Sequence, residues 1–377
     1  MCKETNKILF SVARAAELSH GLTAIMAKEL EISEFIDASR DLPVIDVRTP
    51  SEFEQGHIPD AHNLPIFSDE ERAEIGTLYN QKSRGASIKR GLEIVGPKMR
   101  TFVEKAEKLA PDREILVHCW RGGMRSESMA WLLNFSDFSP RTLTGGYKTF
   151  RNFVLDTFTR RWPVIVLGGM TGSGKTEVLH NMRKMGAQVI DLEGLAHHKG
   201  SAFGAIGEDP QPSNEHFENK LAMRLLSMDT QRPIWVEDES HLVGKNIIPN
   251  DFYDQMRAAP VIEMQVPDED RIEHLIDIYG DYPSDELADS INAISRRLGG
   301  LRTQQALDAL AENDFETVAR LALSYYDKTY TYGLSKRDPE TVFPLELSSI
   351  SHADNARKIM AFHNEKIDNK ALKTNEN

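Results

Sequence analysis

A cysteine beside two glycines and two arginines is the first feature of this sequence that could do chemistry. Segment 119–125 reads Cys-Trp-Arg-Gly-Gly-Met-Arg and follows the short apolar run 115–118, which predicts a strand, a loop and a helix from about Ser126. In such a loop, backbone N–H groups and the helix N-terminus face the sulfur and favour the thiolate. We therefore predict that Cys119 is a nucleophile or a persulfide or selenosulfide carrier, with Arg121 and Arg125 supplying positive charge. The alternative is a buried inert cysteine, which would leave the adjacent glycines and arginines without a role.

A glycine-rich segment with the spacing of a phosphate-binding loop lies further along the chain. Residues 169–176 read Gly-Met-Thr-Gly-Ser-Gly-Lys-Thr, directly after the apolar run 163–167 and before a helix-compatible stretch. Glycines let successive N–H groups turn inward around a phosphate, and the following helix adds its positive end. The predicted phosphate-binding residues are Gly169, Gly172, Ser173, Gly174, Lys175 and Thr176. Lys175 would bridge phosphate oxygens, and Thr176 could hold a magnesium ion.

An acidic segment after another predicted strand could complete this phosphate site. Residues 233–237 form an apolar run, and the chain continues with Asp238 and Glu239. A carboxylate in this position steadies magnesium in proteins with such loops, so Asp238 or Glu237 is predicted to take that role. The alternative is a solvated acidic turn. Asp191, at the end of the strand predicted at 188–191, is a weaker candidate for a substrate contact, and no ligand spacing indicates another metal site.

The elements that must position these residues alternate between strands and helices, which predicts two α/β domains with parallel sheets. The boundaries indicated are an N-terminal helical extension at 1–40, a first α/β domain at 41–150 and a linker at 151–162. A second α/β domain, which carries the phosphate loop, follows at 163–345 and becomes mostly helical from about Asp268. Residues 346–377 are expected to be a C-terminal helix and a polar tail.

Composition sets limits on the class of protein. Of 377 residues, 40% are hydrophobic and 27% are charged, which is ordinary for a globular protein, and no apolar run is long enough to span a membrane. Charged residues near the N-terminus argue against a signal peptide, and the only cysteines are Cys2 and Cys119, so we expect a cytoplasmic protein without a disulfide framework. The net charge of −13 means that any nucleic acid must bind through a local basic patch. The sequence predicts no oligomeric state.

Several segments resemble known families. Segments 46–48 (Asp-Val-Arg), 52–53 (Glu-Phe) and 56–61 (Gly-His-Ile-Pro-Asp-Ala) resemble the N-terminal signature of the rhodanese family, and the Cys119 loop and residues 145–146 resemble its active loop and closing motif. A rhodanese-like domain followed by a P-loop domain is similar to the bacterial tRNA 2-selenouridine synthase family over about residues 41–345. Supporting segments are 76–79, 119–126, 168–176, 236–240 and 297–300.

This resemblance implies a two-step reaction on the wobble uridine of tRNA. Geranyl diphosphate first alkylates the sulfur of 2-thiouridine, and selenium from selenophosphate then displaces the S-geranyl group to give 2-selenouridine. An alkylated sulfur is a far better leaving group than a thiocarbonyl sulfur. By position, Cys119 would carry selenium and the loop at Lys175 would hold the diphosphate. The implied partners are the tRNA anticodon loop and an enzyme that supplies selenophosphate.

Contacts with tRNA are expected from an aromatic side chain and scattered cations. Trp120, beside the cysteine, could stack on an unstacked anticodon base. The cationic candidates are Arg183, Lys199, Arg296, Arg297 and Arg302, for which a solvated surface is the alternative. Because Arg296 and Arg297 precede two glycines, the end of a helix also explains them.

One departure from common rhodaneses leaves other reactions open. Cys119 and Arg125 are separated by five residues, the spacing of cysteine phosphatases, whereas a sulfurtransferase loop is usually one residue shorter. The wider loop has room for a tetrahedral oxyanion such as selenophosphate, but the spacing alone does not distinguish between the reactions that such a pocket supports. Two alternatives therefore remain, a P-loop kinase or NTPase with a regulatory rhodanese domain, and a cysteine phosphatase or thiosulfate sulfurtransferase.

Overall fold

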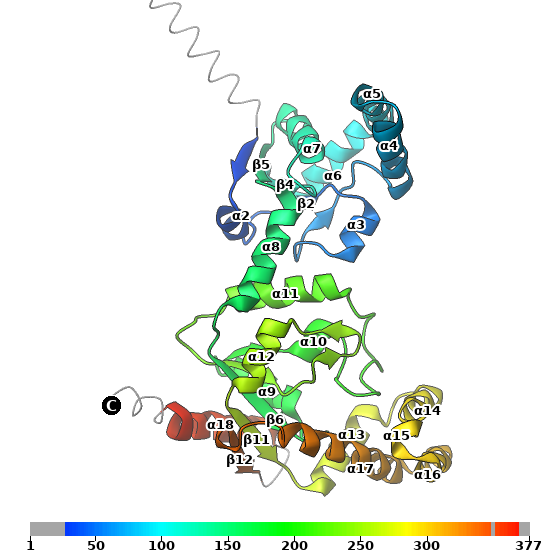
Figure 1. The fold of residues 1–377 in the computed structure, drawn as a ribbon, viewed down its shortest axis with the longest axis vertical. Coiled ribbons are helices and arrows are strands. Elements are labelled where there is room, and N and C mark those ends of the chain that lie inside the picture. The colour runs from blue at the N-terminus through cyan, green and yellow to red at the C-terminus, as the bar shows by residue number, and fades with distance from the viewer. Residues whose placement is uncertain (1–26, 348–350, 369–377) are drawn as a thin grey trace, which may run out of the picture. The chain divides into compact units, whose positions relative to one another are not determined.

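The computed structural model describes residues 27–347 and 351–368, and the chain divides into two units at Leu155. Each unit contains one five-stranded sheet in which all paired strands run parallel (Figure 1). The α/β class with parallel sheets, predicted from the alternation of strands and helices, is thus confirmed. No helix among the described residues is long and apolar enough to cross a membrane.

The first unit is a parallel sheet with strand order β1-β5-β4-β2-β3. Its strands are β1 (Lys28–Leu30), β2 (Val44–Asp46), β3 (His62–Asn63), β4 (Glu114–His118) and β5 (Ser139–Leu143). Its helices are α2 (Ile32–Ala38), α3 (Pro50–Gln55), α4 (Asp69–Gln81), α5 (Arg84–Val95), α6 (Met99–Leu109), α7 (Met124–Phe135) and α8 (Gly146–Thr159), the last of which continues four residues past the division between the units.

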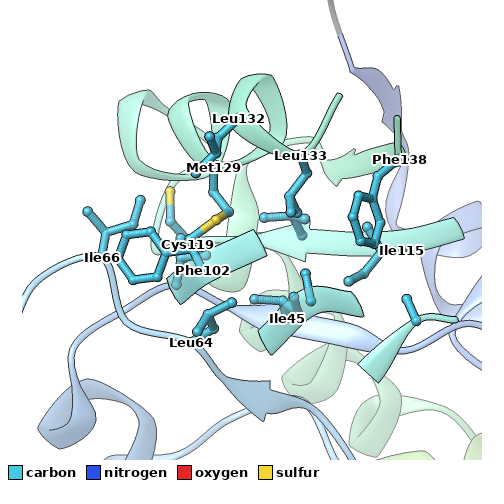
Figure 2. Close-up of a cluster of buried hydrophobic side chains, with 14 residues drawn as sticks. Ile45, Leu64, Ile66, Phe102, Ile115, Cys119, Met129, Leu132, Leu133 and Phe138 are labelled. Carbon is cyan, nitrogen blue, oxygen red and sulfur yellow. The ribbon is translucent and has the colours of Figure 1, made fainter. Parts of the chain in front are cut away.

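The central strands of this sheet are buried on both faces. Val44, Ile45, Leu116 and Val117 are all buried, as expected for a parallel sheet covered by helices on each side. On one face, α6 and α7 pack side chains such as Phe102 against the sheet to form the cluster in Figure 2. This packing fixes the carboxyl end of β4, where the Cys119 loop begins.

The predicted domain boundaries differ from the structure at both ends of this unit. Residues 1–26 of the predicted extension lie outside the described residues, but β1 pairs with Arg141–Leu143 of β5 and so belongs to the sheet. A strand of only three residues, two of them charged and exposed, carries too little apolar pattern to be recognised. The predicted linker 151–162 is also not a separate segment, because α8 continues to Thr159.

The second unit is a parallel sheet with strand order β12-β11-β6-β8-β7. The strands are β6 (Val164–Gly169), β7 (Gln188–Ile190), β8 (Ile234–Glu237), β11 (Val261–Gln265) and β12 (Val342–Glu346), with a separate hairpin of β9 (Leu242–Val243) and β10 (Asn246–Ile247). The helices are α9 (Lys175–Lys184), α10 (Leu192–Ala196), α11 (Asn214–Leu226), α12 (Asn250–Ala258), α13 (Asp268–Tyr279), α14 (Ser284–Ala293), α15 (Ser295–Leu298), α16 (Gly300–Ala311), α17 (Phe315–Leu334) and α18 (His352–His363).

Helix α18 is part of this unit rather than of a separate tail. Its Ala356 and Ile359 are fully buried in the same cluster as Val178 and Leu179 of α9 and strand residues such as Leu167. The predicted boundary at 345 is therefore displaced, because the apolar face of α18 has to be covered by the sheet and by α9.

Helices α13 to α17 make up the helical part of the second unit, and this part has an apolar cluster of its own. Ile291 of α14, Ala306 of α16 and Val318 of α17 meet in it, together with Phe203 from the loop after α10. The helical character predicted from about Asp268 matches the start of α13. This helical part supplies most of one wall of the cavity described below.

Candidate active site

The Cys119 loop connects β4 to α7, and its sulfur faces the start of that helix. The N–H of Gly123 donates to Sγ of Cys119 at 3.4 Å, and Oγ of Ser126 lies 3.2 Å from the same sulfur. Helix α7 begins at Met124, two residues before the predicted start. Cys119 is 3% exposed and borders the apolar cluster in Figure 2, beside Met129 and Phe102. The sulfur therefore has hydrogen-bonding groups on one side and apolar side chains on the other.

Two glycines, one in the Cys119 loop and one at the start of α8, allow the backbone around the loop to pack closely. Gly122 and Gly146 have φ of 63°, and a Cβ on Gly146 would lie 2.4 Å from the carbonyl oxygen of Cys119 and from the nitrogen of Gly122. The N–H groups of Tyr147 and Lys148 donate to the carbonyls of Cys119 (2.8 Å) and Trp120 (3.0 Å). The close approach of these two backbone segments explains why glycines occupy both positions.

The two predicted arginines differ in their surroundings. Arg125 donates to both carboxylate oxygens of Glu52 on α3, at 2.6 and 3.2 Å, and its side chain is 17% exposed. Although burial opposes it, this guanidinium lowers the pKa of Glu52. The charge of Arg125 is therefore largely compensated, whereas the side chain of Arg121 is exposed at the surface of the loop.

A buried group of side chains lies next to the loop, and two of them, Asp46 and Arg48, belong to the rhodanese-like segment 46–48 but were not predicted as site residues. Arg48 is 1% exposed and donates to both carboxylate oxygens of Asp46, and its guanidinium carbon lies 3.7 Å from the ring centroid of Tyr147. His118 is fully buried, with Nε2 3.8 Å from Oδ2 of Asp46. Burial lowers the pKa of His118 despite the neighbouring Asp46 carboxylate, so this ring is neutral at pH 7.

The first unit is expected to lose stability as the pH falls below about 6.5. The unfolded His118 takes up a proton near its ordinary pKa, whereas the folded one does so only at lower pH, so protons favour unfolding in that range. Going from pH 7 to pH 5 should cost this unit roughly 1–2 kcal/mol. Hydrogen exchange of β4 amides, measured at both pH values and corrected for intrinsic exchange, checks this. His118→Asn should show a smaller pH effect, and an equal effect would contradict the assignment to His118.

The phosphate loop of the second unit runs from the end of β6 into α9. Gly172 and Gly174 have φ of 81° and 72°, and Nζ of Lys175 donates to the carbonyl of Gly169 at 2.9 Å across its own loop. Oγ of Ser173 is buried without a hydrogen-bond partner among the described residues. Glycines with positive φ, a lysine side chain that crosses the loop and the N-terminus of the following helix together form a phosphate-binding site, here called the phosphate cradle. The six predicted residues, Gly169, Gly172, Ser173, Gly174, Lys175 and Thr176, all line one cavity.

The predicted acidic partner of this loop is placed differently from the expectation. Asp238 lines the cavity, but its Oδ1 accepts a hydrogen bond from Arg337 at 2.5 Å and lies 3.8 Å from Arg257. Glu237 is fully buried, its pKa is raised well above the usual range by burial, and it accepts a hydrogen bond from the N–H of Leu192. Two arginines that come from elsewhere in the chain thus compensate the charge of Asp238.

Two other carboxylates lie beside the loop instead. Oγ1 of Thr176 donates to Oε2 of Glu193 at 2.8 Å, and both Glu193 and Glu239 line the cavity. Burial, together with the Glu193 carboxylate, raises the pKa of Glu239 to about 8. Glu239 lies in the acidic segment after β8, where the sequence signal was present, but nothing in the sequence marks Glu193. Asp191 is not among the residues that line the cavity, and its oxygens accept from the N–H of Gly194 and contact His180.

The cavity has a volume of about 700 Å³, and the phosphate loop forms one side of it. Beyond the loop its walls are mostly aliphatic and aromatic. They include Phe203, Leu275, Ile276, Ile278, Tyr279, Leu287, Phe315, Val318, Ala319, Ala322, Leu323, Tyr326 and Tyr330. This volume lies within the range of small-molecule sites. The site therefore combines a place for phosphate groups with a place for an apolar group.

The predicted tRNA contacts are divided between the two units. Trp120 lies in the first unit, 5.7 Å from the Tyr147 ring, and Arg183 is at the end of α9 remote from the phosphate loop. Lys199 lines the cavity and is paired with Glu208 at 3.0 Å. The remaining candidates, Arg296, Arg297 and Arg302, share the neighbouring helices α15 and α16 and are exposed. Helix α15 ends at Leu298 and is followed by the C-cap Gly299, with φ of 93°, which agrees with the helix end that the glycine pair indicated.

Fold and site together define a rhodanese-like domain joined to a P-loop domain. Residues 30–153 match the rhodanese-like domain family, and residues 162–359 match the family described as the tRNA 2-selenouridine synthase AAA domain. The chain belongs to the tRNA 2-selenouridine synthase family, as the segments noted in the sequence predicted.

Full-length relatives support the same assignment. The chain is 34% identical over 343 residues to the tRNA 2-selenouridine synthase of Aeromonas salmonicida, an alignment that covers 80% of this chain and 90% of the relative. The corresponding protein of Shewanella denitrificans is 34% identical over 359 residues, 84% of this chain and 95% of the relative. A solved N-terminal domain of an ATP/GTP binding protein from Clostridium difficile is 36% identical, with a TM-score of 0.32, over 34% of this chain and 99% of that one.

Proposed function

We propose that this protein converts 2-thiouridine in tRNA to 2-selenouridine through an S-geranyl intermediate. Geranyl diphosphate is the donor of the first step and selenophosphate the source of selenium for the second. The observation that carries the first step is the cavity of the second unit, in which a phosphate cradle adjoins apolar walls. A diphosphate head on an apolar ten-carbon chain matches that combination.

The cavity walls favour a prenyl chain over a nucleotide. A nucleoside would place a polar ribose and base beyond the phosphates, where Leu275, Val318 and Leu323 offer no hydrogen bonds. Burying a prenyl chain against the same side chains stabilises the complex through the hydrophobic effect. This argument disfavours the kinase alternative, in which ATP would occupy the loop.

The residues of the loop fit the chemistry of alkylation. The sulfur of 2-thiouridine forms a bond to C1 of the geranyl group, the C1–O bond breaks, and diphosphate leaves with the electron pair. The proton on N3 of the base passes to water, so that the alkylated base is neutral. Lys175 and the N–H groups of the loop stabilise the charge that develops on the leaving group. A magnesium ion would add to this by neutralising diphosphate charge, and Thr176, Glu193 and Glu239 would hold it, because their oxygens are gathered beside the loop.

The Cys119 loop suits the second step. Its N–H donor at Gly123 and the N-terminus of α7 stabilise negative charge at Sγ or on a selenium bound to it. In the proposed step, selenide from the hydrolysis of selenophosphate attacks a mixed disulfide between Cys119 and a small thiol, which leaves a selenosulfide on Sγ and releases the small thiol. The selenosulfide anion then bonds to C2 of the base, and the alkylated sulfur departs as geranylthiol after taking up a proton. The small thiol cleaves the Se–S bond, which releases 2-selenouridine and restores the mixed disulfide.

The direct test supplies the purified protein with 2-thiouridine tRNA, geranyl diphosphate and selenophosphate, and follows nucleosides by mass spectrometry. We expect S-geranyl-2-thiouridine and then 2-selenouridine. Omission of selenophosphate should stop the reaction at the geranylated nucleoside. If the tRNA shows no change in mass under any of these conditions while ATP is hydrolysed, the kinase or NTPase alternative replaces this proposal.

Narrowing the cavity should discriminate between donors of different length. Ala322→Phe adds a ring to the apolar wall, so geranylation should fall about 10- to 100-fold, whereas transfer from the five-carbon dimethylallyl diphosphate should fall much less. Initial rates with both donors measure this. Ala311→Phe, at the exposed end of α16, is the matched control. Equal losses with both donors would show that the chain does not occupy this wall.

A further inference from the structure

Three side chains from distant parts of the sequence converge beside the last glycine of the phosphate loop. They are Glu177 in the first turn of α9, His274 of α13 and His352 at the start of α18. One oxygen or nitrogen atom from each lies within 4.8 Å of the other two, and Nε2 of His274 is 3.5 Å from Oε2 of Glu177. The two imidazole rings approach edge to face, with centroids 5.1 Å apart. This arrangement directs the ligand atoms to a common point.

One of the three converging groups has no hydrogen-bond partner in the described part of the protein. Nε2 of His352 is buried and has no hydrogen-bond partner among the described residues. The position that a Cβ would occupy on Gly174 lies 2.7 Å from Nε2 of His352 and 3.7 Å from Nε2 of His274. A side chain at this position of the loop would therefore collide with His352. A buried ring nitrogen without a partner costs stability unless a ligand completes it.

The chemistry of these three groups is that of a transition-metal site. Two imidazole nitrogens and one carboxylate oxygen form a common ligand set for Zn²⁺, which leaves a fourth position open. Magnesium prefers oxygen ligands and does not suit this set.

We propose that Glu177, His274 and His352 bind one divalent transition metal ion of the Zn²⁺ class. Such an ion connects α13 and α18 to the first turn of α9, three elements that otherwise meet through side-chain packing. Because Glu177 and His274 also line the cavity, the open coordination position faces the space beside the phosphate loop. The site is separate from Thr176, Glu193 and Glu239, which we proposed as ligands of magnesium.

The test uses the full chain after removal of metals with a chelator. Zn²⁺ binding is followed by calorimetry, and Co²⁺ is added as a spectroscopic probe, because its visible bands report nitrogen ligands and tetrahedral geometry. We expect one strong site per chain and a rise in the melting temperature of roughly 5 °C at saturating Zn²⁺. His352→Ala and His274→Ala should each weaken binding at least 100-fold and abolish both the tetrahedral Co²⁺ spectrum and the rise in melting temperature.

Two controls make the result specific. His180→Ala removes a histidine of the same helix that pairs with the carboxylate of Asp191, and this variant should bind Zn²⁺ as wild type does. Cys119→Ser removes the only cysteine among the described residues and should also leave the site intact. Glu177→Gln preserves the shape of the side chain and should weaken binding without unfolding the protein, as circular dichroism would show. Unchanged Zn²⁺ affinity in both His274→Ala and His352→Ala would overturn the proposal.

Discussion

Cys119→Ala is expected to stop the reaction at S-geranyl-2-thiouridine and to lower the formation of 2-selenouridine by about 1,000-fold or more. The sulfur is the only atom of the loop to which selenium can be bound covalently, and the loop is organised around it. Gly123 and Ser126 contact the sulfur, and Tyr147 holds the carbonyl of the same residue. Removal of Sγ leaves the hydrogen-bond donors of the Cys119 loop without the atom that they stabilise. The geranylated nucleoside should accumulate, because the phosphate loop is unchanged.

The readout is the ratio of the two nucleosides in tRNA digests over time. Cys119→Ser is the closest substitution in shape and should fail in the same way, because an alcohol does not carry selenium under these conditions. Glu127→Ala, an exposed position of α7, is the control for general damage to the helix. Selenouridine formation at the wild-type rate by Cys119→Ala would exclude Cys119 as the carrier, and the proposed geranylation step would stand unaffected.

Lys175→Ala is expected to lower the rate of geranylation by about 100-fold. The amine lies across the phosphate loop, within 2.9 Å of the Gly169 carbonyl, and a bound diphosphate would take over that interaction. Its positive charge stabilises the leaving diphosphate more than the intact donor, so the loss should appear mainly in kcat. Supplied with tRNA that is already geranylated, the variant should form 2-selenouridine at the wild-type rate.

Binding of inorganic pyrophosphate provides an independent measurement on the same variant. Calorimetry should show weaker binding for Lys175→Ala and unchanged binding for Lys184→Ala, which removes an exposed lysine at the opposite end of the same helix. If geranylation and pyrophosphate binding both remain at wild-type levels, the loop does not hold the donor. Selective loss of geranylation on Lys175→Ala and of selenium insertion on Cys119→Ala would assign one step to each unit.

The two motifs were visible in the sequence because each is built from consecutive residues. The glycine loop at 169–176 and the cysteine loop at 119–125 need only a preceding strand and a following helix, both of which are marked by local apolar pattern. The apolar runs at 115–118 and 163–167 were correctly assigned as strands for the same reason. The family assignment also depended on these local segments and on their order.

Tertiary structure decided everything that requires residues distant in the chain to meet. The guanidinium of Arg337 compensates the negative charge of Asp238, although the two residues are 99 positions apart in the sequence. The carboxylates that lie beside Thr176 without such an arginine are those of Glu193 and Glu239. The apolar cavity is assembled from several helices whose patterns predict burial but not what they bury against.

The cluster of Glu177, His274 and His352 is the clearest case of a site that the sequence alone could not predict. Each residue is unremarkable in its own segment, and no spacing in the sequence connects them. Local chemistry can therefore be determined from sequence because neighbouring residues share one element. Sites assembled from separate elements depend on the sheet and on the helix packing that bring those elements together.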